Sequence, residues 1–196
     1  MKILLVSDVE TPYLWDFFQP DKFNDIDLII SCGDLKVDYL SFLVTMIKAP
    51  LYYVPGNHNE KYLKSPPEGC ESIDGKLVVY KGVRILGLGG SMRYNAAGNY
   101  QYTEKEMKKR IFKLKAKLWW NKGFDILVTH SPSYGYGDGK DLCHIGFKCF
   151  NDLLNKYSPK YFFHGHQHLN YGLKPRILQH GTTKIVNAFE YYIVEY

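Results

Sequence analysis

The sequence has no long apolar run. Near the N-terminus only residues 3–6 are uninterruptedly aliphatic before Ser7 and Asp8. A signal peptide needs an apolar stretch of about 7 to 15 residues and a membrane-spanning helix needs roughly 20, and no segment of the chain approaches that length. We therefore expect a cytoplasmic protein without membrane association.

Cysteine is scarce as well. The four cysteines, Cys32, Cys70, Cys143 and Cys149, form no C-x-x-C pair. This spacing, without a secretory signal, disfavours a disulfide framework and a zinc ribbon. We expect four reduced thiols, with Cys32 as a small core residue at the end of an apolar strand pattern.

Low-complexity tracts and fixed-period repeats are also missing, which disfavours disordered, fibrous and solenoid classes. The chain has 196 residues, of which 45% are hydrophobic and 23% are charged. A chain of this length and composition buries one sizeable core. We expect a single domain spanning residues 1–196, with no evident cap domain.

Positive charge is in modest excess and is unevenly placed. The net charge is +5, and eight of the 25 lysine and arginine residues fall within residues 103–122. In the same segment Met107, Ile111, Leu114 and Leu118 recur at helical spacing. This pattern predicts one amphipathic helix with a solvated lysine face, which we favour over a nucleic-acid-binding surface.

Short apolar runs alternate with helical patterns along the chain. Strands are predicted at residues 2–7, 27–32, 51–54, 76–80, 83–88, 124–130, 160–164, 176–180, 183–188 and 191–196, and helices at residues 37–47, 103–122 and 145–156. Lys81-Gly82 predicts a hairpin, and a turn at Gly181-Thr182 predicts an antiparallel meander of the last three strands. Alternating strands and helices followed by hairpins indicate an α/β fold with a partly antiparallel sheet.

Five predicted strands end in polar groups that are able to bind a metal ion. These groups are Asp8 and Glu10, Asp34, Asn57 and His58, His130, and His166 and His168. In α/β sheets ligands bind at the carboxyl ends of strands, so these side chains should converge although they are far apart in the sequence. Their arrangement predicts an active site.

Each of these residues has a structural alternative when it is considered alone. Asp8 could cap a helix, and His130 could be a hydrogen-bonded structural histidine. Gly33-Asp34 and Gly56-Asn57 could be turns. We favour an active site because the structural alternative requires five independent accidents at the same end of five strands. His164 is expected to face the core and is left out of the site.

The motifs occur in a fixed order. They are Asp8-x-Glu10, Gly33-Asp34, Gly56-Asn57-His58, His130 and Gly165-His166-Gln167-His168, with the segment LGLGGS at residues 86–91 between the third and the fourth. This ordered set resembles the calcineurin-like metallophosphoesterase family, from residue 2 to about residue 190. The resemblance implies an α/β fold that is a four-layer α/β/β/α sandwich of two mixed β-sheets flanked by helices.

The resemblance also implies a site for two divalent metal ions, bridged by Asp34. Asp8, Glu10 and His168 would complete one metal site, and Asn57, His130 and His166 would complete the other. His58 would not be a ligand and would protonate the leaving alkoxide or stabilise transition-state charge. Imidazole, carboxylate and amide donors without thiolate indicate Mn, Fe, Co, Ni or catalytic Zn rather than structural zinc.

Two positions depart from the family pattern. Glu10 replaces the usual histidine, and its harder, charged oxygen donor predicts a shift towards Mn²⁺ or a weaker first site. Asn59 replaces the acidic residue that usually follows His58. A carboxylate there would orient His58 and raise its basicity, whereas an amide only forms hydrogen bonds. We therefore expect Asn59 to influence His58 and to reduce activity.

Arg93 and His144 are the candidate substrate contacts. Arg93 could bind a phosphate oxygen or form a surface salt bridge, and His144 could contact the substrate or begin the helix near residue 145. We expect hydrolysis of small or nucleotide-like phosphodiesters. The alternatives are phosphomonoester hydrolysis and a weakened module that binds metal and phosphate without turnover. A nuclease would additionally require the lysine-rich helix to lie beside the site.

Overall fold

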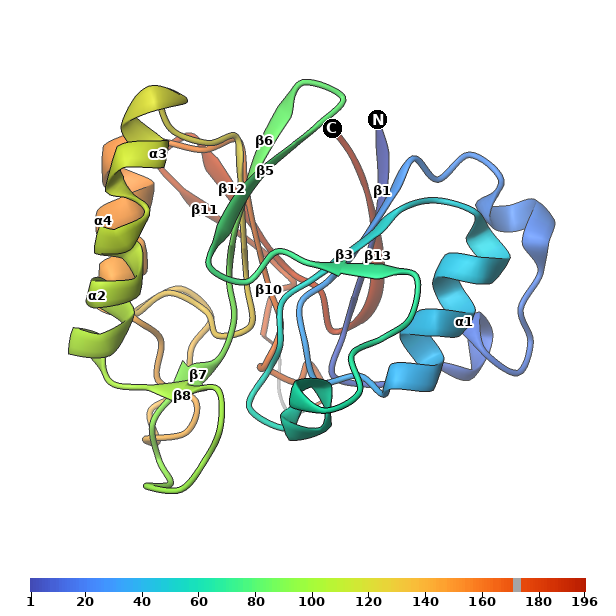
Figure 1. Ribbon diagram of the computed structural model, residues 1–196, viewed down its shortest axis with the longest axis horizontal. Coiled ribbons are helices and arrows are strands. Elements are labelled where there is room, and N and C mark those ends of the chain that lie inside the picture. The colour runs from blue at the N-terminus through green and yellow to red at the C-terminus, as the bar shows by residue number, and fades with distance from the viewer. Residues whose placement is uncertain (171–173) are drawn as a thin grey trace.

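The computed structural model describes residues 1–170 and 174–196. Two mixed β-sheets face each other, and each carries helices on its outer face (Figure 1). This is the four-layer α/β/β/α sandwich that the family resemblance implies. Among the described residues, no helix combines the length and the apolar character that crossing a bilayer requires.

The first sheet contains five strands in the order β13-β1-β2-β3-β4. They are β13 (Glu190–Glu195), β1 (Lys2–Ser7), β2 (Leu28–Ser31), β3 (Leu51–Tyr53) and β4 (Cys70–Ser72). Strands β1 to β4 are parallel, and β13 is antiparallel to β1. Helix α1 (Val37–Ile47) connects β2 to β3 and covers the outer face of this sheet (Figure 1).

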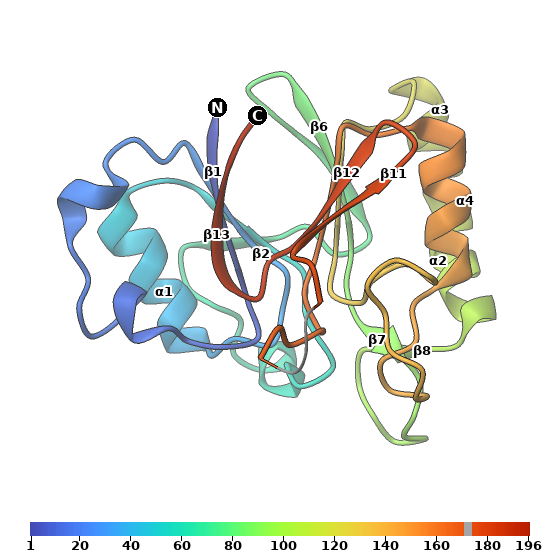
Figure 2. The same cartoon turned by 180° about the vertical axis from the view of Figure 1, so that it is seen from behind.

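The second sheet contains six strands in the order β11-β12-β10-β9-β6-β5. They are β11 (Ile177–His180), β12 (Thr183–Asn187), β10 (Tyr161–His164), β9 (Ile126–Thr129), β6 (Val83–Leu88) and β5 (Lys76–Tyr80). The four central strands are parallel, and both edge strands are antiparallel to their neighbours. Helices α2 (Glu104–Lys113), α3 (Lys115–Trp120) and α4 (Lys148–Tyr157) cover its outer face, as Figure 2 shows from behind.

Short elements complete the chain. They are the 3₁₀ turns η1 (Pro12–Leu14), η2 (Pro20–Phe23) and η3 (Glu60–Leu63), and the two-stranded ribbon of β7 (Ser91–Met92) and β8 (Gln101–Tyr102). Turn η3 and the β7–β8 ribbon lie at the end of the molecule opposite the two chain termini (Figure 1).

Three hydrophobic layers follow from the alternation of side chains along the strands. Leu5 and Ile30 face the interior between the two sheets, where they belong to one core cluster with Phe163 of the second sheet. Their neighbours Leu4 and Ile29 point the other way and pack with the buried face of α1. The outer face of the second sheet packs in the same way against α2, α3 and α4.

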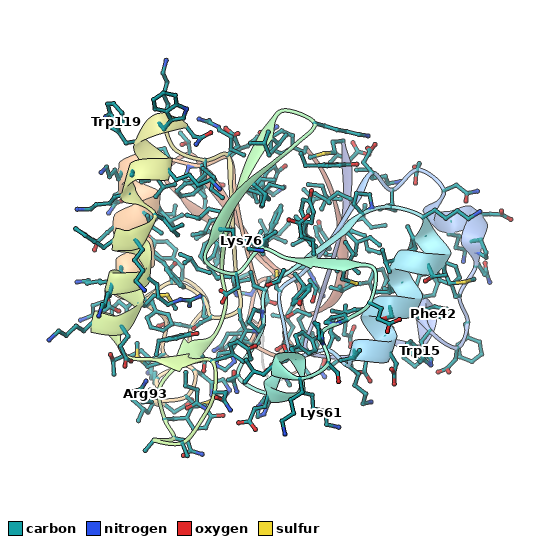
Figure 3. The ribbon with its side chains drawn as sticks, viewed as in Figure 1. Trp15, Phe42, Lys61, Lys76, Arg93 and Trp119 are labelled. Carbon is teal, nitrogen blue, oxygen red and sulfur yellow. The ribbon has the colours of Figure 1, made fainter. Side chains whose placement is uncertain are left out.

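The lysine-rich segment forms two short helices instead of the single predicted one. The chain turns at Leu114, whose N–H donates to Ile111 O at 3.0 Å in a 3₁₀-type bond. Leu114 and Leu118 are both buried after the turn. The lysines of the segment point away from the core, and Trp119 is exposed at the end of α3 (Figure 3).

The predicted meander of the last three strands is only partly correct. β11 and β12 form the expected hairpin, but β13 pairs with β1 in the other sheet. The chain crosses between the sheets at Phe189 and Glu190, where Glu190 has φ +60° and Phe189 is bridged to Ser7. Phe189 N donates to Asn187 Oδ1 at 2.9 Å, which fixes this turn. Local sequence favoured a hairpin, and pairing with the distant strand β1 overrode it.

Candidate metal centre

Five of the loops that follow parallel strands meet at one end of the sandwich. Asp8 follows β1, Asp34 follows β2, Asn57 follows β3, His130 follows β9 and His166 follows β10. His130 Nε2 lies 3.1 Å from Asn57 Oδ1 and 3.2 Å from Asp34 Oδ2, so loops from both sheets are in direct contact. The convergence that the strand ends predict is therefore present for this group.

Three of these residues have a left-handed backbone. The φ angles are +67° at Asp8, +58° at Asp34 and +65° at His166. Side chains other than glycine seldom adopt this conformation, and such positions cluster at functional sites. Here each one turns the chain sharply within three residues of a strand end, and the side chain is directed towards the other loops.

The glycines of two motifs are required by close approach. A Cβ on Gly56 would collide with the carboxylate of Asp34 and would lie 2.7 Å from His130 Cε1. A Cβ on Gly165 would collide with Ser7 Oγ and would lie 2.6 Å from Asp8 Oδ2. The glycines in Gly56-Asn57 and Gly165-His166 therefore leave room for the candidate metal ligands of neighbouring loops.

Asp34 and His130 form a buried ion pair at the centre of the site. Burial disfavours the charge on both residues, but the charge of each partner and the hydrogen bond between them outweigh burial. As a result the pKa of Asp34 is lowered to about 2 and the pKa of His130 is raised to about 9. The site thus stabilises positive charge next to the Asp34 carboxylate, where a bound cation would replace the imidazolium proton.

Backbone carbonyls orient both buried site histidines. His130 Nδ1 lies 2.8 Å from Cys32 O, and His166 Nε2 lies 2.8 Å from Cys143 O. In each ring the nitrogen beside the carbonyl carries the proton, which leaves His130 Nε2 and His166 Nδ1 as the nitrogen donors for a metal ion. Such backbone hydrogen bonds are typical of metal-binding histidines.

Asp34, His130 and His166 each offer a ligand atom, and the three atoms lie within 4.8 Å of one another. Asn57 Oδ1 is the fourth donor, 3.1 Å from His130 Nε2. One carboxylate, one amide oxygen and two imidazoles suit a divalent transition metal ion. The residues on this side of the site therefore fit a divalent cation.

Asp8 and His168 form the other side. Both oxygens of the Asp8 carboxylate accept the backbone N–H of His166, at 2.9 and 3.0 Å. Burial of Asp8 raises the pKa of its carboxyl group. His168 Nε2 is 3.9 Å from Asp8 Oδ1, and the His168 ring packs on Phe189 with centroids 4.9 Å apart. Burying a carboxylate is unfavourable unless a positive charge lies beside it. A cation bound next to Asp8 and His168 would supply that charge.

The carboxylate of Glu10 has another partner. Glu10 Oε1 accepts the backbone N–H of Lys36 at 3.0 Å, and Glu10 Oε2 lies 2.6 Å from Lys36 Nζ. In the described part of the chain, the groups of potential ligands that lie close together include Asp34, His130 and His166 but not Glu10, Asp8 or His168. The structure therefore directs this side chain to the N-terminus of α1.

His58 and Asn59 occupy different environments. His58 is exposed, and its backbone N–H donates to Asp34 Oδ1 at 2.9 Å. Asn59 is buried, and its Oδ1 accepts the backbone N–H groups of Asp34 and Gly56, both at 2.8 Å. Asn59 Nδ2 donates to Leu35 O at 3.1 Å. All these contacts of Asn59 are with the backbone, so it connects the loops after β2 and β3 and does not orient the His58 ring.

The two candidate substrate contacts differ in position. Arg93 lies 3.0 Å from the carboxylate of Glu106 and donates to Gln101 O at 3.2 Å, so the structure favours the salt bridge for this residue. His144 precedes α4 and does not begin it, and Nδ1 lies 2.8 Å from Asp141 Oδ1. The His144 ring centroid is 5.1 Å from that of His166, which places His144 beside the metal centre.

Sequence patterns gave no indication of Tyr94. Its hydroxyl accepts a hydrogen bond from Asn57 Nδ2 at 3.0 Å, which orients the amide so that Oδ1 faces His130. Tyr94 lies in the connection between β7 and β8. With 17 tyrosines in the chain, a single loop tyrosine carries no signal, and only the folded chain brings it to the site.

An open cleft of about 870 Å³ adjoins the metal centre. Asp8, Asp34 and His58 form part of its wall, and Lys61 and Lys64 line the part next to η3. Figure 3 shows Lys61 at the end of the molecule that carries the strand-end loops. The centre is therefore accessible from solvent through a cleft with positive charge on one side.

Comparisons with known proteins agree with this geometry. The profile of the calcineurin-like phosphoesterase family matches residues 1–170. An uncharacterized protein of Haemophilus influenzae is 25% identical over 172 residues, covering 73% of this chain and 73% of that protein. Metallophosphoesterase domain-containing protein 1 of Homo sapiens is 27% identical over 173 residues, covering 82% of this chain and 49% of that protein. The matched region thus spans about half the length of the human protein.

A solved crystal structure has the same fold. It superposes with a TM-score of 0.70 at 13% sequence identity and covers 98% of this chain and 94% of that chain. The region matched by the family profile includes all the strand-end loops that carry candidate ligands, from Asp8 to His168. The chain therefore belongs to the calcineurin-like phosphoesterase family of metal-dependent phosphoesterases.

Proposed function

We propose that this protein hydrolyses phosphodiesters of small or nucleotide-like molecules with the help of two divalent metal ions. The observation that carries the proposal is the contact between loops of both sheets, which places Asp34, His130 and His166 within 4.8 Å of one another beside an open cleft. A cleft that exposes such a donor group to solvent gives a small phosphate ester direct access to it.

Six residues would hold the two ions. Asn57, His130 and His166 would bind one ion, Asp8 and His168 would bind the other, and Asp34 would lie between them. The bound ions would supply a hydroxide nucleophile at neutral pH and would neutralise charge on the phosphoryl oxygens. We favour Mn²⁺ because two carboxylates and an amide oxygen accompany the imidazoles, with Fe, Co, Ni and Zn as alternatives.

His58 would act as the proton donor. Its backbone N–H is fixed to Asp34 Oδ1 at 2.9 Å, and its side chain is exposed at the cleft that would hold the substrate. An imidazole is a common general acid in hydrolysis, so His58 would give a proton to the leaving alkoxide. The leaving group would thus depart on the side of the cleft lined by Lys61 and Lys64.

Initial rates with two model esters test the proposal. Metal-stripped protein is reconstituted with Mn²⁺ and assayed on bis-p-nitrophenyl phosphate and on p-nitrophenyl phosphate. We expect faster hydrolysis of the diester, no turnover by Asp34→Asn, and a loss of about 10²- to 10⁴-fold in kcat for His58→Asn. A preference for the monoester would instead make the protein a phosphomonoesterase. No cleavage of either ester by protein that binds two ions would contradict the proposed activity.

A further inference from the structure

Glu10 and Lys36 form an ion pair at the edge of the cleft. Both carboxylate oxygens of Glu10 are engaged, Oε1 by the Lys36 backbone N–H and Oε2 by Lys36 Nζ. The side chain of Glu10 is 26% exposed, whereas that of Lys36 is 77% exposed. The pair also lines a second hollow of about 270 Å³, with Trp15 and Tyr39 in its wall.

The hydrogen bond between Glu10 and the Lys36 backbone caps the N-terminus of α1. Lys36 is the N-cap residue of the helix, and its own side chain forms no cap hydrogen bond. The first N–H groups of a helix have no partner within the helix, and a negative charge near them is favourable. Glu10 accepts one of these N–H groups from a loop that is 26 residues away in sequence. Its position is thus determined by the helix end and by Lys36.

The two sides of the metal centre consequently differ in their donors. Asn57, His130 and His166 share one side with Asp34, and hydrogen bonds to Tyr94, Cys32 and Cys143 hold all three side chains in place. The other side offers the buried Asp8 and the half-exposed His168, whose ring nitrogen is 3.9 Å from Asp8 Oδ1. It has fewer donors, and within residues 1–170 and 174–196 no hydrogen bond holds the His168 ring, whose Nε2 is beyond hydrogen-bond distance of Asp8.

We infer that Glu10 caps helix α1 and is not a metal ligand, so the two metal sites of this protein bind divalent ions with unequal affinity. The site of Asn57, His130 and His166 is the tight one, and the site of Asp8 and His168 exchanges its ion readily. This inference rests on the proposed binuclear site. It departs from the ligand set implied by the family resemblance, in which Glu10 completes the first site.

Titration of metal-free protein with Mn²⁺ tests the inference without any enzyme assay. Calorimetry of the wild type should resolve one tight site and a second site that is weaker by about tenfold or more. Glu10→Gln removes the charge but keeps the shape, and both dissociation constants should stay within about twofold of the wild type. Two equal sites in the wild type, or a loss of about tenfold or more on Glu10→Gln, would overturn the inference.

A second variant and a matched control make the test sharper. An imidazole in place of Glu10 forms no ion pair with Lys36, so Glu10→His should strengthen the weaker site by about tenfold or more. Unchanged binding in Glu10→His would contradict the inference. Asp38→Asn removes an equal charge from the same cleft and serves as the control, because Asp38 is exposed in the first turn of α1. The Mn²⁺ titration distinguishes equal from unequal sites whether or not the protein cleaves an ester.

Discussion

Asn59 has a different role from the one that its position in the sequence predicts. Its position after His58 suggested that it influences the imidazole. The buried amide instead accepts two backbone N–H groups and donates to the Leu35 carbonyl. Asp34 and Gly56, which provide the accepted N–H groups, belong to loops after two different strands. Asn59 is therefore a connection between loops, and its effect on Asp34 is one of position.

Asn59→Asp should lower stability and leave the pH dependence of the reaction unchanged. A carboxylate accepts both N–H groups but has no hydrogen to donate, so the buried Leu35 carbonyl would lose this partner. We expect a loss of about 1 to 3 kcal/mol in the free energy of unfolding, measured by urea denaturation. Asn24→Asp, at an exposed asparagine, is the control. A shift of either limb of the pH-rate profile in Asn59→Asp would show that this residue does act on His58.

Strands were predicted best where they are short, almost entirely buried apolar runs, and helix α1 was predicted from its helical periodicity. The strands that carry the site residues, β1, β2, β3, β9 and β10, lie within the predicted ranges, and α1 has the predicted bounds. The short strands β4, β7 and β8 were not predicted. The larger errors concern the break between α2 and α3 and the partner of β13. In both cases the deciding contacts come from other elements: Leu114 and Leu118 pack in the core cluster of the second sheet, and β13 pairs with β1.

An ion pair joins two neighbouring strands at the end of the second sheet away from the site. Arg84 in β6 donates from its backbone N and from Nε to Asp125 Oδ2, both at 2.8 Å, and Asp125 directly precedes β9. Arg84 Nη1 also donates to Asn121 O at 2.6 Å, after α3. Hydrogen bonds from Arg84 lower the pKa of Asp125. The pair therefore fixes the register of β6 and β9 at the point where the chain leaves α3.

This pair should contribute to stability in a pH-dependent manner. The pKa of Asp125 is lower in the folded protein than in the unfolded chain, so its contribution is complete above the unfolded pKa of about 3.9 and is lost as the pH falls through the folded pKa. Asp125→Asn should lower the free energy of unfolding by about 1 to 3 kcal/mol at pH 7. In urea denaturation the difference from the wild type should shrink below about pH 4.

The matched control for this prediction is Asp16→Asn, at an exposed aspartate in the loop after β1. Asp16→Asn should change the free energy of unfolding by less than about 0.5 kcal/mol both at pH 7 and below about pH 4. A difference between wild type and Asp125→Asn that stays constant from about pH 7 to about pH 2 would contradict a role for the charge of Asp125.

In the whole molecule, the candidate metal centre connects the two sheets. Asp8, Asp34 and Asn57 come from loops of the first sheet, and His130 and His166 come from loops of the second. Away from this centre the contact between the sheets is mainly a hydrophobic layer, with polar contacts such as the hydrogen bond from Tyr161 Oη to Glu195 O at 3.0 Å. Ions bound by these residues would hold both sheets together at one end, so metal binding should stabilise the entire sandwich.

Mn²⁺ should therefore raise the melting temperature of metal-free protein. Binding to the folded state alone contributes about 2.7 kcal/mol at a free concentration about one hundred times the dissociation constant. The shift should be largely lost in His130→Ala, which removes a buried donor, and kept in His180→Ala, which removes a histidine from the end of β11. Differential scanning calorimetry measures both. An equal Mn²⁺ shift in wild type and His130→Ala would contradict binding at the candidate centre.

The sequence by itself determined most of the strands and helices and the chemical types at the strand ends. Those features depend on apolar runs, on helical periodicity and on the motifs Gly33-Asp34, Gly56-Asn57 and Gly165-His166, which are local in the chain. The tertiary structure decided which partner each polar side chain takes. Glu10 turns to Lys36, Tyr94 reaches Asn57 and Arg93 pairs with Glu106. A polar side chain bonds to whichever groups the folded loops bring within reach, and no local pattern encodes that proximity.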